Sequence, residues 1–378
     1  RCRDNNTHQR PVMIVAPLSL IENWQAEVEE TFYKSPFTDI VVLQSGADLK
    51  NYRIKGAGRE TQQQLGEDGL ISEQEEIRYS LKVGKAYGSD RLDMPGRMVL
   101  TTYQTLRDYQ FSLSRIHWGV VAFDEAQNMK NPNALATRAA KGLNADFKLL
   151  ATGTPVENSL KDFWCLLDTA VPGLLGSWQA FRKEFITPIT SASDDNVRAM
   201  KVDVGKQLRD KVGDYMLRRT KEERLPDLPE KKIYTGDSNS LSAEHLEILS
   251  GEMSGVQLKH YDDIVNSVHD VSDEDKRRLI LPSLLGLKIT SIHHDLVGKG
   301  NINDLTNDLL KQAKTSCKIV AMLSILKEIK KRDEKVLIFA TTKLIQAYIS
   351  ALIANIYQVP VEIVNGETKA VATKKEEA

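Results

Sequence analysis

The segment VVAFDEAQ, residues 120–127, constrains the fold of this chain more than any other stretch of the sequence. Its apolar, β-branched start is typical of a strand buried in a parallel sheet. Asp124 and Glu125 follow directly, and a parallel strand delivers such residues to the carboxyl edge of the sheet, where open α/β folds bind ligands. One carboxylate there can hold Mg²⁺, and its neighbour can orient or deprotonate an attacking water. A strand that simply stops at a polar loop would have the same pattern.

Further apolar runs of strand length alternate with helical patterns over the first 170 residues. Four more strands are predicted, at residues 12–16, 40–43, 98–102 and 147–151. Ser19 is predicted to cap a helix that ends near Phe32, with Glu22 as the capping-box partner. Strands that alternate with helices indicate an α/β fold with a doubly wound parallel sheet.

The rest of the chain suggests two further regions. Residues 171–315 are charged and mainly helical, with one short strand expected near Ile233, and are interpreted as a helical insertion or bridge. Its helices are predicted at residues 178–185, 204–221, 242–268 and 273–285. Residues 316–378 resume the alternation, with strands at 335–340 and 361–364, and are predicted to begin a second α/β domain. Residues 1–170 are predicted to form the first domain, interrupted at 44–96 by a charged surface insert with one helix near 72–83.

Composition excludes several classes of protein. The formal net charge of the 378 residues is −1, so a nucleic-acid partner would have to bind a local patch rather than a global positive field. Cys2, Cys165 and Cys317 lie far apart, which argues against a zinc site and a disulfide framework and suits a reducing compartment. No apolar run approaches the ~20 residues of a membrane-spanning helix. The chain begins at Arg1, not Met, and is interpreted as part of something longer.

Polar residues close three of the predicted strands. Thr152 and Thr154 flank a glycine in the turn TGTP, and their hydroxyls can bond a carboxylate or a phosphate. The segments Pro17-Leu18-Ser19 and Thr101-Thr102-Tyr103 close two other strands, where hydroxyls and backbone N–H groups suit phosphate. A simple turn and ordinary helix capping are the alternative interpretations.

Joined in this order, these segments resemble the Swi/Snf family of DNA-dependent ATPases, within helicase superfamily two. The matching segments are IVAPLSL (14–20) with NW (23–24), VLTTY (99–103), FDEAQNMKNP (123–132), LATGTP (150–155) with EN (157–158), MLRRTK (216–221), LPEK (228–231), KVLIF (335–339) and NGET (365–368). The resemblance implies a first RecA-like lobe, a helical insertion and the start of a second RecA-like lobe.

The resemblance also implies catalytic roles. Asp124 would coordinate the Mg²⁺ of Mg-ATP, and Glu125 would position and activate the hydrolytic water. Gln127 stands where the family usually has His, and it can still couple the site to neighbouring loops by hydrogen bonds. Thr152 and Thr154 would link hydrolysis to movement between the lobes. ATP and Mg²⁺ are therefore the expected cofactors.

Double-stranded DNA is the partner that the resemblance implies, and the family moves along it, typically without unwinding. Pro17, Ser19, Thr101, Thr102 and Tyr103 would hold the phosphate backbone of one strand. Arg218 and Arg219 would lie in the segment that braces the two lobes. We expect a monomer without membrane association, in the cytoplasm of a bacterium or archaeon or in the nucleus of a eukaryote. Protein partners and the object that is moved on DNA are left open.

Two departures from the family bear on activity. The phosphate-binding loop GxxxxGK[ST] is not found in the sequence and is expected upstream of Arg1, and the later second-lobe motifs are missing beyond Glu367. We therefore expect these residues alone to bind ATP poorly and to hydrolyse it negligibly. The alternatives are a degenerate helicase core that only binds DNA or a protein, and a strand-separating helicase of the same superfamily.

Other candidate residues have structural explanations. His293-His294-Asp295 is expected to cap the end of a helix rather than to bind metal, because adjacent side chains rarely ligate one ion. The four tryptophans, Trp24, Trp118, Trp164 and Trp178, are expected to pack in the core rather than to stack on bases.

Overall fold

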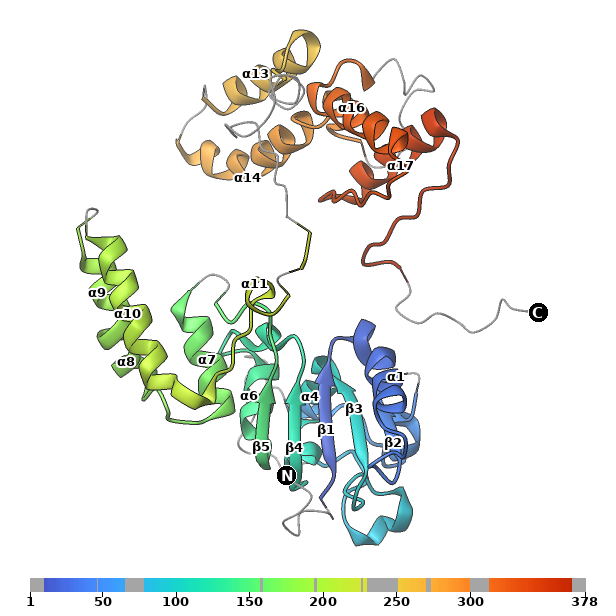
Figure 1. The fold of residues 1–378 in the computed structure, drawn as a ribbon, viewed down its shortest axis with the longest axis vertical. Helices are drawn as coiled ribbons and strands as arrows, with labels where there is room; N and C mark the ends of the chain where they lie inside the picture. The colour runs from blue at the N-terminus through green and yellow to red at the C-terminus, as the bar shows by residue number, and fades with distance from the viewer. Residues whose placement is uncertain are drawn as a thin grey trace. The chain divides into compact units, whose positions relative to one another are not determined.

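The computed structural model describes residues 10–45, 47–64, 78–156, 159–193, 196–225, 227–229, 251–269, 273–299 and 313–368. The chain divides into two compact units, the first extending to Thr220 and the second formed by Lys221–Lys369 (Figure 1). The domain boundaries predicted at residues 170 and 315 stay predictions.

A five-stranded parallel sheet forms the centre of the first unit, with the strand order β2-β3-β1-β4-β5. Its strands are β1 (Val12–Ala16), β2 (Ile40–Leu43), β3 (Met98–Thr102), β4 (Trp118–Phe123) and β5 (Ala145–Leu150). All five strands predicted within residues 1–170 are present. The prediction of an α/β fold with a parallel sheet is therefore confirmed.

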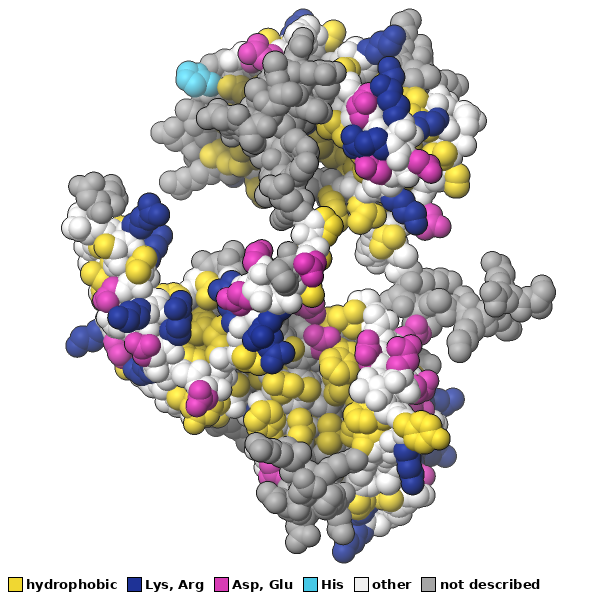
Figure 2. Space-filling view, in the orientation of Figure 1, with side chains coloured by type: hydrophobic (Ala, Val, Ile, Leu, Met, Phe, Trp, Pro, Cys, Tyr) yellow, Lys and Arg dark blue, Asp and Glu magenta, His cyan; other side chains and the backbone are white. Residues whose placement is uncertain are grey.

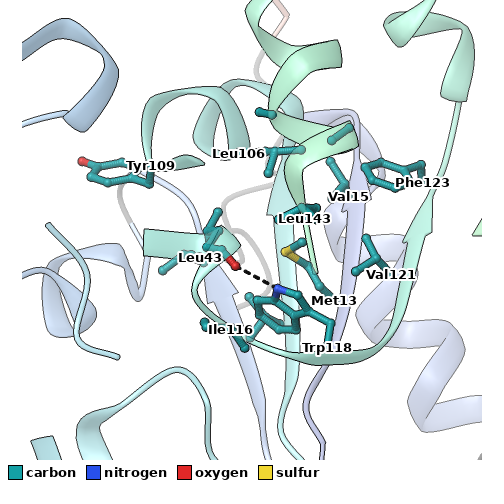
Figure 3. Packing of buried hydrophobic residues seen from close by; sticks show 14 of the residues in the cluster. Met13, Val15, Leu43, Leu106, Tyr109, Ile116, Trp118, Val121, Phe123 and Leu143 are labelled. Carbon is teal, nitrogen blue, oxygen red and sulfur yellow. Dashed lines mark hydrogen bonds between the residues drawn. The ribbon is translucent and has the colours of Figure 1, made fainter. Parts of the chain in front are cut away.

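Helices cover the two faces of the sheet because alternate strand residues point to opposite sides. On one face, α1 (Ile21–Thr31) packs on Ile14 and Leu100. On the other face, Val15, Phe123 and their neighbours form the largest apolar cluster with three helices (Figure 3). These are α4 (Tyr103–Asp108), α5 (Gln110–Ser114) and α6 (Leu135–Gly142). Trp118 lies fully buried there, and its indole N–H donates to the Leu113 carbonyl at 3.0 Å.

The start of α1 differs from the prediction. A 3₁₀ turn, η2 (Leu18–Leu20), precedes the helix, and the backbone N–H of Leu20 donates to the Pro17 carbonyl at 2.9 Å. Leu20 is the N-cap residue and caps without its side chain, so the capping box predicted for Ser19 and Glu22 is wrong. The 3₁₀ turn leaves Ser19 exposed at the edge of the sheet.

The insert at residues 44–96 is not a simple surface excursion. Its described elements are α2 (Leu49–Tyr52), α3 (Glu60–Gln64) and η3 (Lys85–Asp90). Leu81 and Leu92 are buried in the main apolar cluster, and Glu60 is fully buried. Of the helix predicted near 72–83, residues 72–77 lie outside the described residues, and Leu81 instead forms an antiparallel bridge with Arg53. The charge-rich composition of the insert gave no indication that Glu60, Leu81 and Leu92 are buried.

Part of the sheet carries apolar side chains that face solvent. Phe147 and Leu149 on β5 are 53% and 50% exposed. Figure 2 shows hydrophobic side chains over the same part of the sheet. Within the ranges that the structure describes, α1 packs on the β1–β3 side of this face and leaves β5 uncovered.

A helical layer completes the first unit. It packs on α7 (Leu160–Ala170) through a second apolar cluster that includes Trp164, Phe181 and Leu208. Its elements are α8 (Trp178–Phe181), the π-helical turn η5 (Arg182–Ile186), α9 (Thr187–Ser191), α10 (Val197–Val212) and η6 (Gly213–Tyr215). The helix predicted over 204–221 ends early, because Gly213 takes a positive φ of 50° that terminates α10.

Helices also dominate the second unit. They are α11 (Lys221–Arg224), α13 (Gly255–His269), α14 (Asp273–Thr290), η7 (His294–Leu296), α16 (Cys317–Lys331) and α17 (Lys343–Tyr357). Leu296 of η7, Ile319 of α16 and Tyr348 of α17 lie in one apolar cluster, and Ile289 of α14 packs against it. The strand predicted near Ile233 and the first part of the helix predicted from residue 242 lie outside the described residues.

The two strands predicted at 335–340 and 361–364 are not formed in the described part of the chain. Both segments pair with no neighbouring strand, and Leu337 and Phe339 are 84% and 92% exposed. An apolar run becomes a strand only when a second strand accepts its hydrogen bonds. The start of a second RecA-like lobe therefore stays a prediction. None of the helices in the described ranges has the length and apolar character that a membrane crossing needs.

Candidate active site

The register of the sheet brings four strand ends to one edge. Ala16 pairs with Thr102, Val15 with Phe123, and Phe123 with Leu150. The connections that leave the neighbouring strands β1 and β4 lead to helices on opposite faces. Such a switch between faces opens a crevice at the carboxyl ends of the strands. Asp124 follows β4 directly, so the acid pair lies where the topology favours a ligand.

Asp124 accepts three hydrogen bonds. Its Oδ1 accepts from the backbone N–H of Glu125 at 2.9 Å, and its Oδ2 accepts from Nε1 of Trp24 at 2.9 Å. Its carbonyl oxygen accepts from the Tyr103 hydroxyl at 2.6 Å. Each carboxylate oxygen accepts one donor and has a further lone pair. A half-buried, oriented carboxylate with free lone pairs fits the oxygen ligand that Mg²⁺ prefers.

Glu125 adopts a left-handed conformation with φ of 50° and ψ of 51°. For a residue with a Cβ this conformation is strained, and such strain gathers at functional sites. Glu125 is the N-cap residue of η4 (Ala126–Met129). Its backbone carbonyl accepts from the Asn128 side chain at 2.8 Å.

Gln127 connects Glu125 to the TGTP turn. Its Nε2 donates to Oε2 of Glu125 at 2.6 Å, and its Oε1 accepts from the Thr152 hydroxyl at 2.6 Å. Oγ1 of Thr152 in turn accepts from the backbone N–H of Thr154 at 3.1 Å. The structure thus brings together four of the predicted residues, Glu125, Gln127, Thr152 and Thr154, in one continuous hydrogen-bonded chain. A carboxamide serves as the link because it carries both a donor and an acceptor.

Tyr103 packs beside the acids. Its ring stacks near Phe123 with centroids 6.5 Å apart. Burial raises the pKa of its hydroxyl strongly, and the neighbouring charges of Asp124 and Glu125 raise it further. Tyr103 therefore remains a neutral hydrogen-bond donor to the backbone of Asp124 across the physiological range.

The remaining predicted residues lie on the β1 and β3 side of the same edge. Pro17, Thr102 and Tyr103 line a pocket of about 480 Å³ that is open to solvent. Thr102 caps α4 by accepting from the Thr105 N–H at 3.1 Å. Thr101 points away from this edge, because its fully buried hydroxyl donates to the Leu43 carbonyl at 2.8 Å. We assign Thr101 to the sheet and not to the pocket.

Trp24 is the residue of this site that sequence reasoning missed. The sequence predicts only packing for Trp24, and it does pack against the apolar cluster beside α1. Its indole N–H also reaches the Asp124 carboxylate, which is 100 residues away in sequence. A tryptophan in an amphipathic helix carries no local signal for such a contact.

The histidine segment has a structural role. Nδ1 of His293 accepts from the Asp295 backbone N–H at 3.2 Å and thereby caps η7, which follows α14. His294 is almost fully buried, and burial lowers the pKa of its imidazole. Metal-binding groups of three or more His, Cys, Asp or Glu side chains are absent from the described residues.

The fold and the edge site define an α/β protein with paired acids at the carboxyl edge of a doubly wound parallel sheet. Residues 2–296 match the SNF2-related domain. The chain therefore belongs to this family, the Swi/Snf-type ATPases of helicase superfamily two.

Two relatives have sequences similar to this chain over much of its length. The Zorya protein ZorD of Escherichia coli O139:H28 is 32% identical over 95% of this chain and 30% of its own length. The human DNA excision repair protein ERCC-6 is 28% identical over 65% of this chain and 16% of its own length. The chain thus spans less than a third of these relatives. The solved Sulfolobus solfataricus SWI2/SNF2 ATPase core in complex with dsDNA is 22% identical, with a TM-score of 0.42 over 95% of this chain and 62% of that chain.

Proposed function

We propose that the full-length protein hydrolyses ATP and uses the energy to move along duplex DNA. The observation that supports this most strongly is the hydrogen-bonded chain from Thr152 through Gln127 to Glu125, beside the oriented carboxylate of Asp124. A site that only bound a ligand would not need a linked pair of acids with a connected loop. Relatives named for DNA excision repair support DNA as the partner.

In this proposal each residue has one task. Asp124 holds Mg²⁺, which neutralises charge on the nucleotide phosphates when it is bound. Glu125 orients the attacking water and accepts its proton, while Gln127 holds the Glu125 carboxylate through the bond to Oε2. Thr152 couples the TGTP turn to Glu125, because its hydroxyl is hydrogen-bonded to Gln127 and Gln127 is hydrogen-bonded to Glu125. Pro17, Ser19 and Thr102 contact DNA phosphates at the same sheet edge.

The test is the ATPase rate of the full-length protein with and without duplex DNA. The full-length protein is required because the phosphate-binding loop GxxxxGK[ST] is not among these 378 residues. We expect duplex DNA to stimulate the rate and Glu125→Gln to reduce it by about 10²-fold or more, since a positioned general base contributes that much. The matched control is Glu29→Gln, an exposed glutamate on α1 that should leave the rate unchanged.

The outcomes separate this proposal from its alternatives. A full-length protein that binds duplex DNA without turnover would be a binding module, and the proposal would be wrong. Strand separation on a tailed duplex in the presence of ATP would identify a helicase instead of a translocase. We also propose that residues 1–378 alone have negligible ATPase activity, which the same assay measures directly.

A further inference from the structure

We infer that Arg53 and Arg59, from the insert at residues 44–96, form an additional binding site for DNA phosphates. Both arginines line the pocket of about 480 Å³ together with Pro17 and Thr102. The inference rests on the proposed function, because it adds residues of the insert to the same DNA-contacting edge. Asp124 and Glu125 are not among the lining residues of this pocket. The pocket is therefore distinct from the two acids proposed to act on ATP.

Arg53 is held in place by backbone hydrogen bonds within the insert. Arg53 and Leu81 form an antiparallel bridge, and Leu81 is 1% exposed in the core. On either side of the bridge, the Ile54 N–H donates to the Ser80 carbonyl and the Lys82 N–H donates to the Tyr52 carbonyl, both at 2.8 Å. This short ladder places Arg53 at the pocket wall while its side chain stays exposed.

Arg59 is positioned by the residue that follows it. Glu60 is fully buried, and its carboxylate accepts from the backbone N–H groups of Ser80 at 2.8 Å, Phe111 at 2.9 Å and Ser112 at 3.0 Å. The Ser112 hydroxyl donates to the same carboxylate. A side chain bonded at four points fixes its own backbone, so Arg59 is held at the pocket.

The charges around the pocket leave it positive. Asp108 is the acid among its lining residues, and its side chain is 7% exposed. Arg107 contacts this carboxylate at 2.8 Å and Arg59 contacts it at 3.6 Å, so it is already neutralised. Arg53 has no carboxylate partner among the described residues. A guanidinium without an acid partner, next to hydroxyl and amide groups, suits a phosphodiester backbone.

DNA phosphates fit this surface better than a free nucleotide does. The lining combines the ends of β1 and β3 with the insert, and its neutral hydrogen-bonding groups include Ser45, Gln104 and Asn128. Such a mixture of cations and neutral donors typically positions a nucleic-acid backbone without reading its sequence. The insert therefore extends the DNA contacts beyond Pro17, Ser19 and Thr102.

The test is the salt dependence of duplex-DNA binding by the full-length protein, measured by fluorescence anisotropy of a labelled duplex. Each phosphate contact contributes about 0.9 to the slope of log Kd against log salt concentration. We expect Arg53→Gln and Arg59→Gln each to reduce this slope by about 0.9, and the double variant by about 1.8. Binding at low salt should weaken for random duplexes of any sequence.

The matched control is Lys85→Gln, which removes one exposed charge from the same insert outside the pocket. Equal slope changes for Lys85→Gln and Arg53→Gln would overturn the inference, because a general charge effect would then explain both. An unchanged slope for Arg53→Gln and Arg59→Gln would also overturn it. Arg59→Lys keeps the charge beside Asp108 and should retain the slope even where Arg59→Gln lowers stability. A wild-type protein that does not bind duplex DNA would instead overturn the proposed function.

Discussion

The indole Nε1 of Trp24 donates a hydrogen bond to Oδ2 of Asp124 at a distance of 2.9 Å. Trp24 lies on α1, the helix that follows Pro17 at the end of β1, whereas Asp124 follows β4. Because β1 and β4 are neighbours in the sheet, the bond joins the helix after β1 to the end of β4. One helix thus connects the edge proposed to contact DNA to the carboxylate proposed to hold Mg²⁺.

Trp24→Phe should weaken metal binding in the full-length protein. The substitution keeps an aromatic ring against the apolar cluster and removes the donor to Asp124. A group that hydrogen-bonds a metal ligand holds it in orientation, and removing such a group typically lowers metal affinity by about tenfold or more. We expect the Mg²⁺ concentration for half-maximal ATPase rate and the Kd for Mn²⁺, measured by electron paramagnetic resonance, to rise about tenfold.

Trp178→Phe is the control for this prediction. Trp178 packs against Trp164 with ring centroids 5.5 Å apart, in the second apolar cluster and away from the acids. We expect it to lower the melting temperature without changing the Mn²⁺ affinity. Equal Mn²⁺ affinities for Trp24→Phe and the wild type would show that the indole only packs.

The left-handed conformation of Glu125 should affect the stability of variants at this position. Glu125→Ala and Glu125→Gly both remove the carboxylate, but only glycine adopts a positive φ without strain. We expect Glu125→Gly to be more stable than Glu125→Ala by roughly 0.5–1 kcal/mol after the greater flexibility of unfolded glycine is included. Urea unfolding of the two variants measures this difference. The reverse order would mean that the turn relaxes when the carboxylate is removed.

Replacing Gln127 by His should make activity depend on pH. The carboxamide of Gln127 does not titrate, so it accepts from Thr152 at every physiological pH. An unperturbed imidazole has a pKa of about 6.5, and its protonated form cannot accept that hydrogen bond. We expect the ATPase rate of Gln127→His to approach that of the wild type at high pH and to fall relative to it below about pH 6.5. Parallel profiles for the two proteins would contradict the proposed link.

Glu60 should contribute a pH-dependent part of the stability. Burial raises the pKa of its carboxyl above the ordinary value of 4.5, although hydrogen bonds from Ser112 and Ser80 oppose this shift. The folded state then binds the proton more tightly than the unfolded state does. This contribution is fully present below pH 4.5 and is lost as the pH rises through the folded-state pKa.

Glu60→Gln removes this titration and is the variant that tests it. Its amide nitrogen faces backbone N–H donors, and each donor left without an acceptor costs about 1–3 kcal/mol, so the variant should be less stable than the wild type. The difference in free energy of unfolding between the two should shrink as the pH rises above 4.5, as denaturant titrations at several pH values can measure. A difference that grows with pH would contradict the sign of the shift.

Local patterns were sufficient to predict the sheet. The runs that became β1 to β4 are short and mainly apolar, so neighbouring residues alone indicate a buried strand. β5, with the sequence ADFKLL, is less apolar and more exposed. The same logic placed Asp124 and Glu125 at the carboxyl edge. It failed at 335–340, where an equally apolar run joins no described strand, because a ladder depends on a partner elsewhere in the chain.

The sequence by itself determined the order of the strands along the chain, the acids that follow one of them and the family to which they belong. Only the tertiary structure decided that Trp24 reaches Asp124, that Glu60 anchors the insert to Phe111 and Ser112, and that Thr101 faces Leu43 rather than the edge. A strand or a turn is specified by residues close together in sequence. A hydrogen bond between residues 50 or 100 positions apart exists only once strand order and register bring its two ends together.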